Sequence, residues 1–341
     1  MPQAVVRVTT PSRLHFGMFS FGQAGVRQFG GVGAMIAEPG IRLKITAADR
    51  VDASGPLARR AAEFARTAIA ALRLPPTFGC RIETESAPRE HVGLGTGTQL
   101  GLAIAAAINA LFSLAPLLPE DLARIAGRCQ RSSIGTHGFA VGGLLVEAGR
   151  QVAEQGATKG ADGTRSAPAT LGQVSPLVAR VELPAEWRFL LLVPKTATGL
   201  FGEDERRAFA RIPPVPLAVT EALAREALLN LVPAAIEGDF VEFSRSLGRY
   251  GQLAGNCFAS QQHGAFLDRR TAELAESVRR LGAEGVGQSS WGPTLFAAVP
   301  DETSGHDLQA RLAVDTDLSD YDCLVSRPDN AGAQIDIQRL D

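Results

Sequence analysis

Apolar residues recur with two different periods along the first half of the chain. Strict alternation of apolar and polar positions predicts strands, and apolar residues three to four positions apart predict helices. The expected elements are, in order, a strand over 4–10, a strand pair that follows Gly30 and ends near residue 47, a helix over 56–72, a strand over 78–86, helices over 100–114 and 119–131, and a strand over 142–148. This order contains no regular βαβ repeat, so we expect an α+β fold.

The second half shows the same two periods after a stretch with little hydrophobic pattern. Residues 150–185 are rich in Gly, Ala, Ser and Thr, so we expect two domains, over 1–175 and 176–341. The elements expected beyond this stretch are a strand over 187–195, helices over 216–237, 239–259 and 268–283, a glycine-rich turn into a strand over 285–300, a helix over 306–313 and a strand over 334–340. This order predicts a ferredoxin-like second domain.

The segment 88–114, PREHVGLGTGTQLGLAIAAAINALFSL, joins a glycine-punctuated loop directly to a long apolar helix. Its glycines allow sharp turns and close approach to a ligand, and its threonines add hydroxyl donors. The first helical turn offers unpaired N–H groups and the positive end of the dipole, which together favour an anion. An ordinary loop-to-helix connection has the same pattern, and the glutamine is either a ligand contact or a cap. The candidate residues of this glycine loop are Gly93, Gly95, Thr96, Gly97, Thr98 and Gln99.

Three more polar segments interrupt the apolar pattern. PSRLHFG at 11–17 predicts a turn after the first strand, RSSIGTHGFAVGG at 131–143 predicts a polar bend, and GVGQSSWGPT at 285–294 predicts a second glycine-rich turn. Each is either a plain connection or a ligand contact. Their candidate residues are Ser12, Arg13, His15, Arg131, Thr136, His137, Ser289, Ser290 and Trp291.

Composition limits the kinds of molecule that we expect the protein to bind. The chain has 341 residues with 34 basic and 36 acidic side chains, so it has no polycationic field for nucleic acid or an anionic membrane. It shows neither a signal-peptide pattern nor an uncharged membrane-spanning run, so we expect a cytoplasmic protein with small-molecule partners. The four cysteines, Cys80, Cys129, Cys257 and Cys323, form no CxxC pair, which argues against a zinc knuckle or a disulfide scaffold.

PSRLHFG, GLGTGTQ and GQSSWGPT, in this order and at these separations, resemble the GHMP kinase superfamily. The resemblance implies an N-terminal domain like ribosomal S5 domain 2 and a ferredoxin-like C-terminal domain. Within the superfamily, the chain is most similar to the β-ribofuranosylaminobenzene 5′-phosphate synthase family. The matching segments are 11–17, 29–33, 93–100, 131–143, 199–209 and 287–294.

The family resemblance implies a decarboxylating phosphoribosyl transfer of methanopterin biosynthesis. Phosphoribosyl diphosphate loses pyrophosphate while the carboxylate-bearing ring carbon of 4-aminobenzoate or 4-hydroxybenzoate attacks C1 of the ribose. Loss of CO2 then restores aromaticity. This chemistry needs Mg²⁺ with the pyrophosphate but no redox cofactor, and by analogy we expect a homodimer.

The same resemblance suggests roles for the candidate residues, which must bind pyrophosphate, support a cationic ribosyl transition state and orient the benzoate. We expect the glycine loop to hold Mg²⁺-pyrophosphate, with Ser289 and Ser290 approaching from the other domain. Arg13, Arg131 and Lys195 are candidates for the 5′-phosphate or the benzoate carboxylate, because a cationic side chain suits either.

The two histidines and the tryptophan each allow a functional and a structural interpretation. His15 and His137 either donate to pyrophosphate or the para group of the substrate, or serve as local hydrogen-bonding residues. Trp291 either stacks on the aromatic substrate or belongs to the core. The acids at 203–205 fit a solvated helix start better than a magnesium site, so metal ligands stay unassigned.

Two other function classes remain open: an ATP-dependent small-molecule kinase and a non-catalytic binder of nucleotide or sugar phosphate. GHMP kinases commonly place an acidic residue in the bend that corresponds to residues 134–141. Here that bend has no carboxylate and only Thr136 and His137 as polar side chains. The missing carboxylate favours the transferase, and affinity for ATP would separate the two enzymes.

Overall fold

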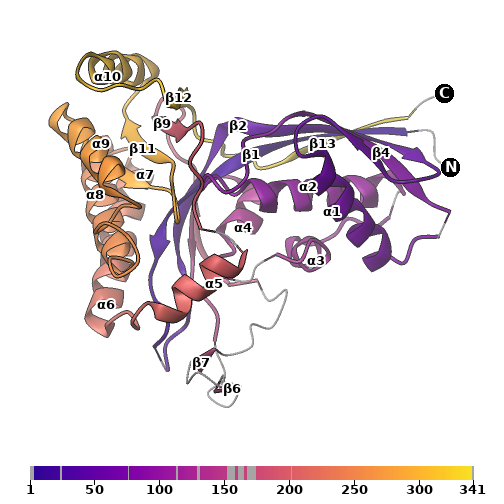
Figure 1. Ribbon diagram of the computed structural model, residues 1–341, viewed down its shortest axis with the longest axis horizontal. Helices are drawn as coiled ribbons and strands as arrows, with labels where there is room; N and C mark the ends of the chain where they lie inside the picture. The colour runs from indigo at the N-terminus through magenta and orange to yellow at the C-terminus, as the bar shows by residue number, and fades with distance from the viewer. Residues whose placement is uncertain are drawn as a thin grey trace.

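The computed structural model describes residues 4–23, 25–75, 77–112, 114–128, 131–151, 174–200 and 202–339, and the backbone of 158–159 and 165–166. A seven-stranded and a four-stranded β-sheet organise this part of the chain, with helices against both (Figure 1). Cys80, Cys257 and Cys323 are free thiols, whereas Cys129 and half of the pattern-poor stretch 150–185 lie outside the described residues.

The seven-stranded sheet is built on one long antiparallel strand pair. β1 (Ala4–Met18) pairs with β2 (Gly31–Ala48) from Val5↔Thr46 to Met18↔Gly31. The other strands of this sheet are β3 (Asp52–Ser54), β4 (Gly79–Ser86), β5 (Leu144–Glu147), β8 (Leu177–Val181) and β13 (Gln334–Arg339). Their order is β13-β1-β2-β4-β3, with β5 pairing with both β2 and β8.

The predicted turn over residues 11–17 is wrong, because β1 continues through it. The strand pairing shifts register between Thr10 and Ser12 and again between His15 and Gly17, and it resumes after each shift. The second shift is a bulge, which absorbs one extra residue of β1 without ending the strand and changes the direction of nearby side chains, whereas at the first shift residues 37–40 of β2 lie opposite Pro11. Arg13 and His15 therefore lie on a strand and not in a flexible turn.

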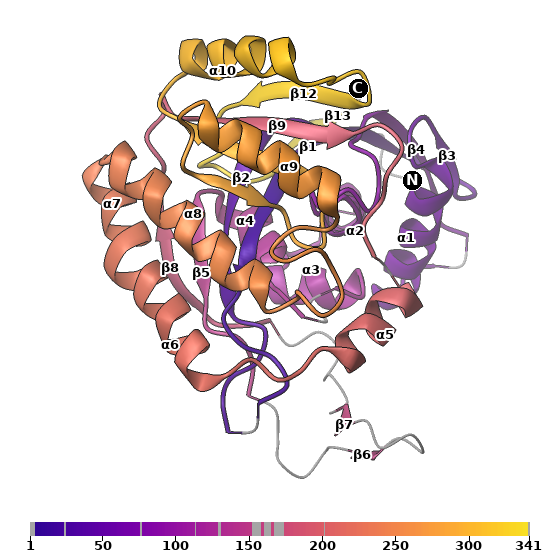
Figure 2. The same ribbon diagram turned by 60° about the vertical axis from the view of Figure 1, so that its left-hand side comes forward.

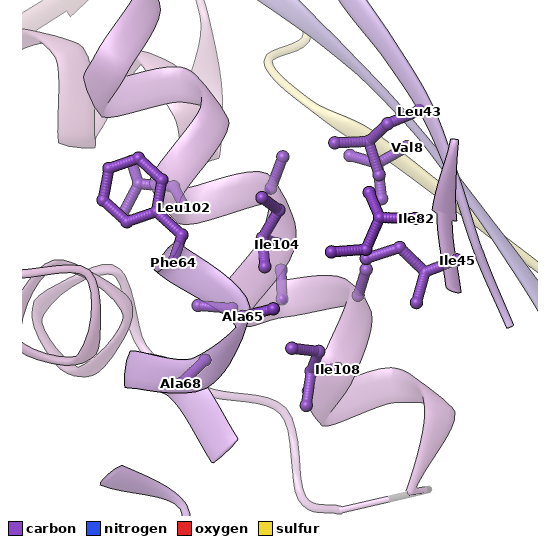
Figure 3. Close-up of a cluster of buried hydrophobic side chains, with 14 of the residues drawn as sticks. Val8, Leu43, Ile45, Phe64, Ala65, Ala68, Ile82, Leu102, Ile104 and Ile108 are labelled. Carbon is purple, nitrogen blue, oxygen red and sulfur yellow. The ribbon is translucent and has the colours of Figure 1, made fainter. Parts of the chain in front are cut away.

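Three helices cover one face of this sheet, α1 (Ala58–Ala71), α2 (Thr96–Leu111) and α4 (Ile134–Val141), and α3 (Pro119–Ile125) packs against these helices. Figure 3 shows Ile104 of α2 between Ala65 of α1 and the strand residues Leu43 and Ile82. Two predictions need correction. The helix expected over 119–131 ends at Ile125, and the bend expected over 131–143 contains α4.

The four-stranded sheet has the order β10-β11-β9-β12, with every pair antiparallel. Its strands are β9 (Arg188–Pro194), β10 (Val286–Gln288), β11 (Leu295–Val299) and β12 (Tyr321–Ser326), of which β12 was not predicted. The accompanying helices are α5 (Gly202–Arg211), α6 (Leu217–Glu226), the π-helix η2 (Ala227–Leu231), α7 (Val232–Glu237), α8 (Phe240–Asn256), α9 (Arg269–Arg280) and α10 (Glu302–Asp315).

Alternating residues of β9 serve two cores. Leu190 and Leu192 pack with α9 and α10. Phe189 and Leu191 pack with α8, with residues 14–16 of β1 and with residues 32–36 of β2. Figure 2 shows α8 and α9 side by side and α10 next to β12. The βαββαβ order is that of a ferredoxin-like domain, so the α+β, two-domain prediction for the fold is confirmed.

The boundary after residue 175 stays a prediction. Two strands on its C-terminal side, β8 and β13, pair with β5 and β1 of the first sheet. The small pair of β6 (Thr158–Lys159) and β7 (Arg165–Ser166) lies just before that boundary. In the described part of the chain, no helix combines the length and the hydropathy that crossing a bilayer requires.

Ile104→Ala tests the central helix. Ile104 is completely buried, so we expect a loss of about 2–5 kcal/mol and a lower midpoint of guanidinium unfolding. Ile236→Ala is the matched control, because Ile236 is 66% exposed and should change stability by less than about 0.5 kcal/mol. Equal effects of the two substitutions would contradict this assignment of the core.

Candidate active site

Two glycine-rich turns from opposite ends of the chain pack against each other. The carbonyl oxygen of Gly93 accepts hydrogen bonds from Ser289 Oγ at 2.6 Å and from Arg13 Nη2 at 3.3 Å. Gly93 has φ = 94°, and a Cβ at this position would lie 2.4 Å from the carbonyl oxygen of Ser289. Only glycine fits there. The predicted segments at 11–17, 93–99 and 287–294 therefore meet.

Ser289 links β1 to this contact. Its completely buried hydroxyl donates to Gly93 and accepts from the backbone N–H of His15 at 3.0 Å. The backbone N–H of Ser290 donates to the carbonyl oxygen of His15, also at 3.0 Å. A hydroxyl has one proton, so Ser289 has none left for a phosphate. Its place in the structure is that of a clamp between segments.

The glycine loop ends at the N-terminus of α2, as expected for an anion site. Gly95 precedes the first helical residue, Thr96, whose hydroxyl donates to the carbonyl oxygen of Arg89 at 3.0 Å. Thr98 is half-buried in the first turn. Gln99 is completely buried and donates to the carbonyl oxygen of Gly135 at 2.8 Å. Gln99 thus joins α2 to α4, and the helix end with Thr98 is left to face a ligand.

Arg13 lies directly beside the glycine loop. A Cβ at Gly95 would lie 3.2 Å from Arg13 Cβ, and Arg13 Nε is buried without a hydrogen-bond partner among the described residues. Burial lowers the pKa of Arg13 to about 10, partly opposed by the charges of Glu147 and Glu205. Arg13 therefore remains a cation at neutral pH, and it has an unused donor next to the helix end.

Other arginines around the loop were not predicted. Arg128 Nη2 donates to the carbonyl oxygen of Gly97 at 2.8 Å, and its guanidinium lies 5.1 Å from the ring centre of Phe64. Arg89 Nη1 donates to the carbonyl oxygen of Pro194 at 2.6 Å. Arg89 lies at the start of the segment 88–114 but was not a candidate, and Arg128 lies outside every segment that was singled out. Arg128 adds positive charge at the predicted anion site.

His15 is a neutral, buried side chain. It is 2% exposed, and its Nε2 has no hydrogen-bond partner among the described residues. Burial, and then the charge of Arg13, hold the pKa of His15 well below its usual range. Its imidazole lines a small cavity of about 30 Å³ together with Trp291. Trp291 is 6% exposed and packs edge-on against Phe209 and Phe258.

The predicted residues of the segment 131–143 are mostly engaged within the protein. His137 Nε2 lies 2.7 Å from the carbonyl oxygen of Ser175, and Thr136 is 1% exposed. Arg131 Nη1 forms an ion pair with Glu205 Oε1 at 2.6 Å. The ion pair of Arg131 and Glu205 links the segment before α4 to α5.

Two other candidates lie apart from the loop. Ser12 Oγ donates to the carbonyl oxygen of Pro39 at 2.5 Å. Lys195 is exposed, and its Nζ donates to the carbonyl oxygen of Ser319 at 2.7 Å. The structure thus gives both polar groups partners elsewhere.

Glu147 is a carboxylate that the sequence analysis missed. It lies at the end of β5 with no exposed surface, and it accepts from Ser132 Oγ at 2.6 Å and from the Ser133 N–H at 2.9 and 2.8 Å. The carboxylate therefore lies at the N-terminus of α4, where negative charge is favourable. The signal was present, because Glu147 is the single charged residue in the apolar run GGLLVEA.

Burial raises the pKa of Glu147 to about 7, against the lowering effect of Ser132, Ser133 and the charge of Arg150. The ordinary value is 4.5, so between pH 4.5 and 7 the folded protein holds a proton that the unfolded chain releases. This contribution to stability is complete below about pH 4.5 and disappears as the pH rises to about 7, a change on the order of 3 kcal/mol.

Glu147→Gln removes this titration. We expect the melting temperature of the variant, relative to wild type, to rise between pH 5 and pH 8, because the amide cannot ionise. Circular dichroism melts at six pH values measure that difference, and Glu221→Gln at an exposed position is the control. A constant difference across the range would mean that Glu147 is ionised throughout.

Comparisons with known proteins agree with this architecture. The family model "GHMP kinases N terminal domain" matches residues 57–143, and "GHMP kinases C terminal" matches residues 231–314. Among solved structures, homoserine kinase from Cytophaga hutchinsonii has a TM-score of 0.62 at 16% identity, covering 98% of each chain. Mevalonate pyrophosphate decarboxylase from Streptococcus pyogenes has a TM-score of 0.64 at 14% identity, covering 97% of this chain and 98% of its own. These likenesses show the fold alone.

Two relatives are more similar in sequence. A beta-ribofuranosylphenol 5′-phosphate synthase from Archaeoglobus fulgidus is 31% identical over 98% of this chain and 100% of its own length. A protein of the same name from Methanothermobacter thermautotrophicus is 29% identical over 88% of this chain and 90% of its own. This chain therefore belongs to the beta-ribofuranosylphenol 5′-phosphate synthase family, within the GHMP kinase superfamily.

Proposed function

We propose that the protein joins phosphoribosyl diphosphate to 4-hydroxybenzoate or 4-aminobenzoate and releases CO2 and pyrophosphate. The observation that carries the proposal is the position of Arg13, between the helix end at the glycine loop and the cavity at His15. A cationic side chain beside a helix N-terminus suits the diphosphate of this substrate. The names of the two relatives support the same reaction class.

The reaction needs two bond exchanges. The bond from ribose C1 to pyrophosphate breaks as the bond from C1 to the carboxylate-bearing ring carbon forms. The carbon–CO2 bond then breaks, and its electron pair returns to the ring, which restores aromaticity. A para hydroxyl or amino group raises the electron density at the attacking carbon, so the protein has to position and stabilise charge more than it has to supply a nucleophile.

We assign the pyrophosphate to the first turn of α2, with Thr98, Arg13 and Arg128 around it. Helix N–H groups and guanidinium donors favour the negative charge that develops as pyrophosphate leaves. The described residues contain no group of three His, Cys, Asp or Glu side chains suited to a metal ion. Mg²⁺ would therefore arrive as part of the substrate, held mainly by the phosphates.

An ATP-dependent small-molecule kinase is the main alternative function, because homoserine kinase shares the fold. Glu147 restores a carboxylate near α4, but Ser132 and Ser133 already donate to its oxygens. It caps a helix and is completely buried, so it does not face a substrate hydroxyl as a base must. A homodimer remains a prediction by analogy.

The decisive experiment supplies purified protein with Mg²⁺, phosphoribosyl diphosphate and benzoates labelled at the carboxyl carbon. We expect CO2 and pyrophosphate in equal amounts without ATP. A parallel incubation contains ATP and a set of small alcohols. Formation of ADP with an alcohol, and no CO2, would establish the kinase and overturn the proposal.

Arg13→Lys tests the anion site. Lysine keeps the charge but loses the Nε donor and the fork geometry, so we expect kcat/KM for phosphoribosyl diphosphate to fall about 10- to 100-fold, or ~1.5–3 kcal/mol. Arg7→Lys is a matched control on the same strand, because the Arg7 side chain is 51% exposed and pairs with Glu85 at 3.7 Å. If Arg13→Lys behaves like this control, Arg13 does not bind the substrate.

A further inference from the structure

An ion pair joins the segment before α4 to the first turn of α5. Arg131 Nη1 lies 2.6 Å from Glu205 Oε1, and the two side chains are 21% and 25% exposed. A pair that is largely withdrawn from water is screened by salt much less than a pair on the surface. Arg131, a cation beside the glycine loop, is therefore held by a carboxylate of its own chain.

The helix that carries this carboxylate is attached to the protein through one face. Glu205 and Phe209 are four residues apart, so they share a face of α5, and both contact Arg131. The Arg131 guanidinium lies 4.1 Å from the ring centre of Phe209. Of the residues of α5, all of which the structure describes, only Ala208 is buried. Figure 2 shows α5 on the outside of the molecule, joined to α6 by an extended segment. A helix with so little buried surface can shift while the rest of the fold stays intact.

α5 begins next to both glycine-rich turns. The Gly199 N–H donates to the carbonyl oxygen of His91 at 2.6 Å, and a Cβ at Gly199 would lie 2.5 Å from the carbonyl oxygen of Gly292. Burial lowers the pKa of Arg13, and the charge of Glu205 is among the effects that oppose this change. The Glu205 carboxylate thus lies within electrostatic range of the cation at the predicted anion site.

Glu205 differs from the other acid that acts on Arg13. Glu147 is completely buried and accepts hydrogen bonds from Ser132 and Ser133, so it is fixed in place. Glu205 keeps a quarter of its surface in contact with water, so it can turn toward solvent when another anion arrives. A guanidinium accepts a carboxylate or a phosphate in the same fork geometry. Arg131 can therefore exchange one anion for the other.

We propose that Glu205 holds Arg131 until a phosphate group of the substrate displaces it, and that α5 shifts as this exchange occurs. The proposal rests on the proposed function and adds to it a residue that determines which anion is bound. The chemistry is that of a phosphate, which phosphoribosyl diphosphate carries both at C5 and at C1 of the ribose.

Charge decides which anions displace Glu205. A phosphate ester carries a charge of about −1.5 to −2 at neutral pH, whereas a carboxylate carries −1. A phosphate therefore gains more from Arg131 than Glu205 does, and the released carboxylate is solvated by water. A monocarboxylate has no such advantage over Glu205. The ion pair thus makes Arg131 selective for phosphate over a simple carboxylic acid.

The first test measures dissociation constants by calorimetry for inorganic pyrophosphate, ribose 5-phosphate and 4-hydroxybenzoate in the presence of Mg²⁺. Glu205→Gln removes the competing charge, so we expect it to bind at least one of the two phosphates about 3- to 10-fold more tightly than wild type. The probe that responds shows which phosphate of the substrate meets Arg131. The affinity for 4-hydroxybenzoate should change less than twofold, because the acid does not compete for this place.

Two further variants separate the contact from the general field of the charge. Glu203→Gln removes the same charge from the same helix, but Glu203 is 57% exposed and pairs with Arg206 of α5 at 2.6 Å, so binding should stay within twofold of wild type. Glu205→Asp keeps the charge but is one methylene shorter, so it weakens the contact with Arg131. Its affinity should fall between those of wild type and Glu205→Gln. A melting curve of each variant shows whether it is folded.

Trp291 reports the movement of α5. Its ring centre lies 5.3 Å from that of Phe209, and Trp187 is the other tryptophan of the chain. In a Trp187→Phe background, the phosphate that binds should shift the emission of Trp291 to longer wavelength as Phe209 moves away. Glu205→Gln in the same background should show part of this shift without any ligand, which separates movement of α5 from a direct effect of the ligand.

The outcomes distinguish this inference from the proposed function. Unchanged or weaker phosphate binding by Glu205→Gln, or an equal effect of Glu203→Gln, would overturn the exchange, and so would tighter binding of 4-hydroxybenzoate alone. An unchanged Trp291 emission at saturating phosphate would overturn the movement of α5. None of these results depends on turnover. Tighter phosphate binding by Glu205→Gln, together with no CO2 from any benzoate, would overturn the proposed function and leave the exchange at Arg131 standing.

Discussion

The hydroxyl of Ser289 connects three segments that are far apart in the sequence. It donates to the carbonyl oxygen of Gly93 and accepts from the backbone of His15, so the turn between β10 and β11 is fastened to both the glycine loop and β1. The clamp is completely buried. The helix end of α2 lies on one side of it and the cavity at His15 on the other. The distance between the two parts of the site is therefore set by backbone contacts, which are more rigid than surface side chains.

Both cationic and acidic side chains lie around this clamp. Arg13 and Arg128 reach the glycine loop through Gly93 and Gly97. The acidic groups are engaged elsewhere: Glu147 caps α4, and Glu205 pairs with Arg131. Both acids still lie close enough to raise the pKa of Arg13. Glu90 also lies at the loop, because its Oε1 would be 3.7 Å from a Cβ at Gly97, so cations and carboxylates both lie near the helix end, and Glu147 and Glu205 favour the charged form of Arg13.

Periodicity predicted most of the elements, and it failed where packing overrides local signals. Pro11 and Gly17 suggested a turn, but register shifts beside them let β1 continue against β2. Gly135 and Gly138 suggested a bend, but both lie in α4, and at Gly138 a neighbouring side chain leaves no room for a Cβ. A Cβ at Gly138 would lie 2.1 Å from Met35 Sδ. A glycine occurs both where a helix or strand ends and where neighbouring atoms leave no room for a side chain, and a single sequence does not separate the two cases.

The same distinction applies to the site. The motifs located the glycine loop, β1, the start of β2 and the turn between β10 and β11, because their glycines are needed for close backbone contacts. They did not reveal which polar groups are already used. Ser289 and Thr96 looked like phosphate donors, yet both hydroxyls hold backbone carbonyls. Arg128 and Glu147, which set the charge of the site, lie outside or at the edge of the motifs. Hydrogen-bond partners depend on tertiary contacts that sequence spacing does not encode. Spacing therefore could not show that these hydroxyls are used, whereas Arg13 Nε beside the glycine loop has no hydrogen-bond partner among the described residues.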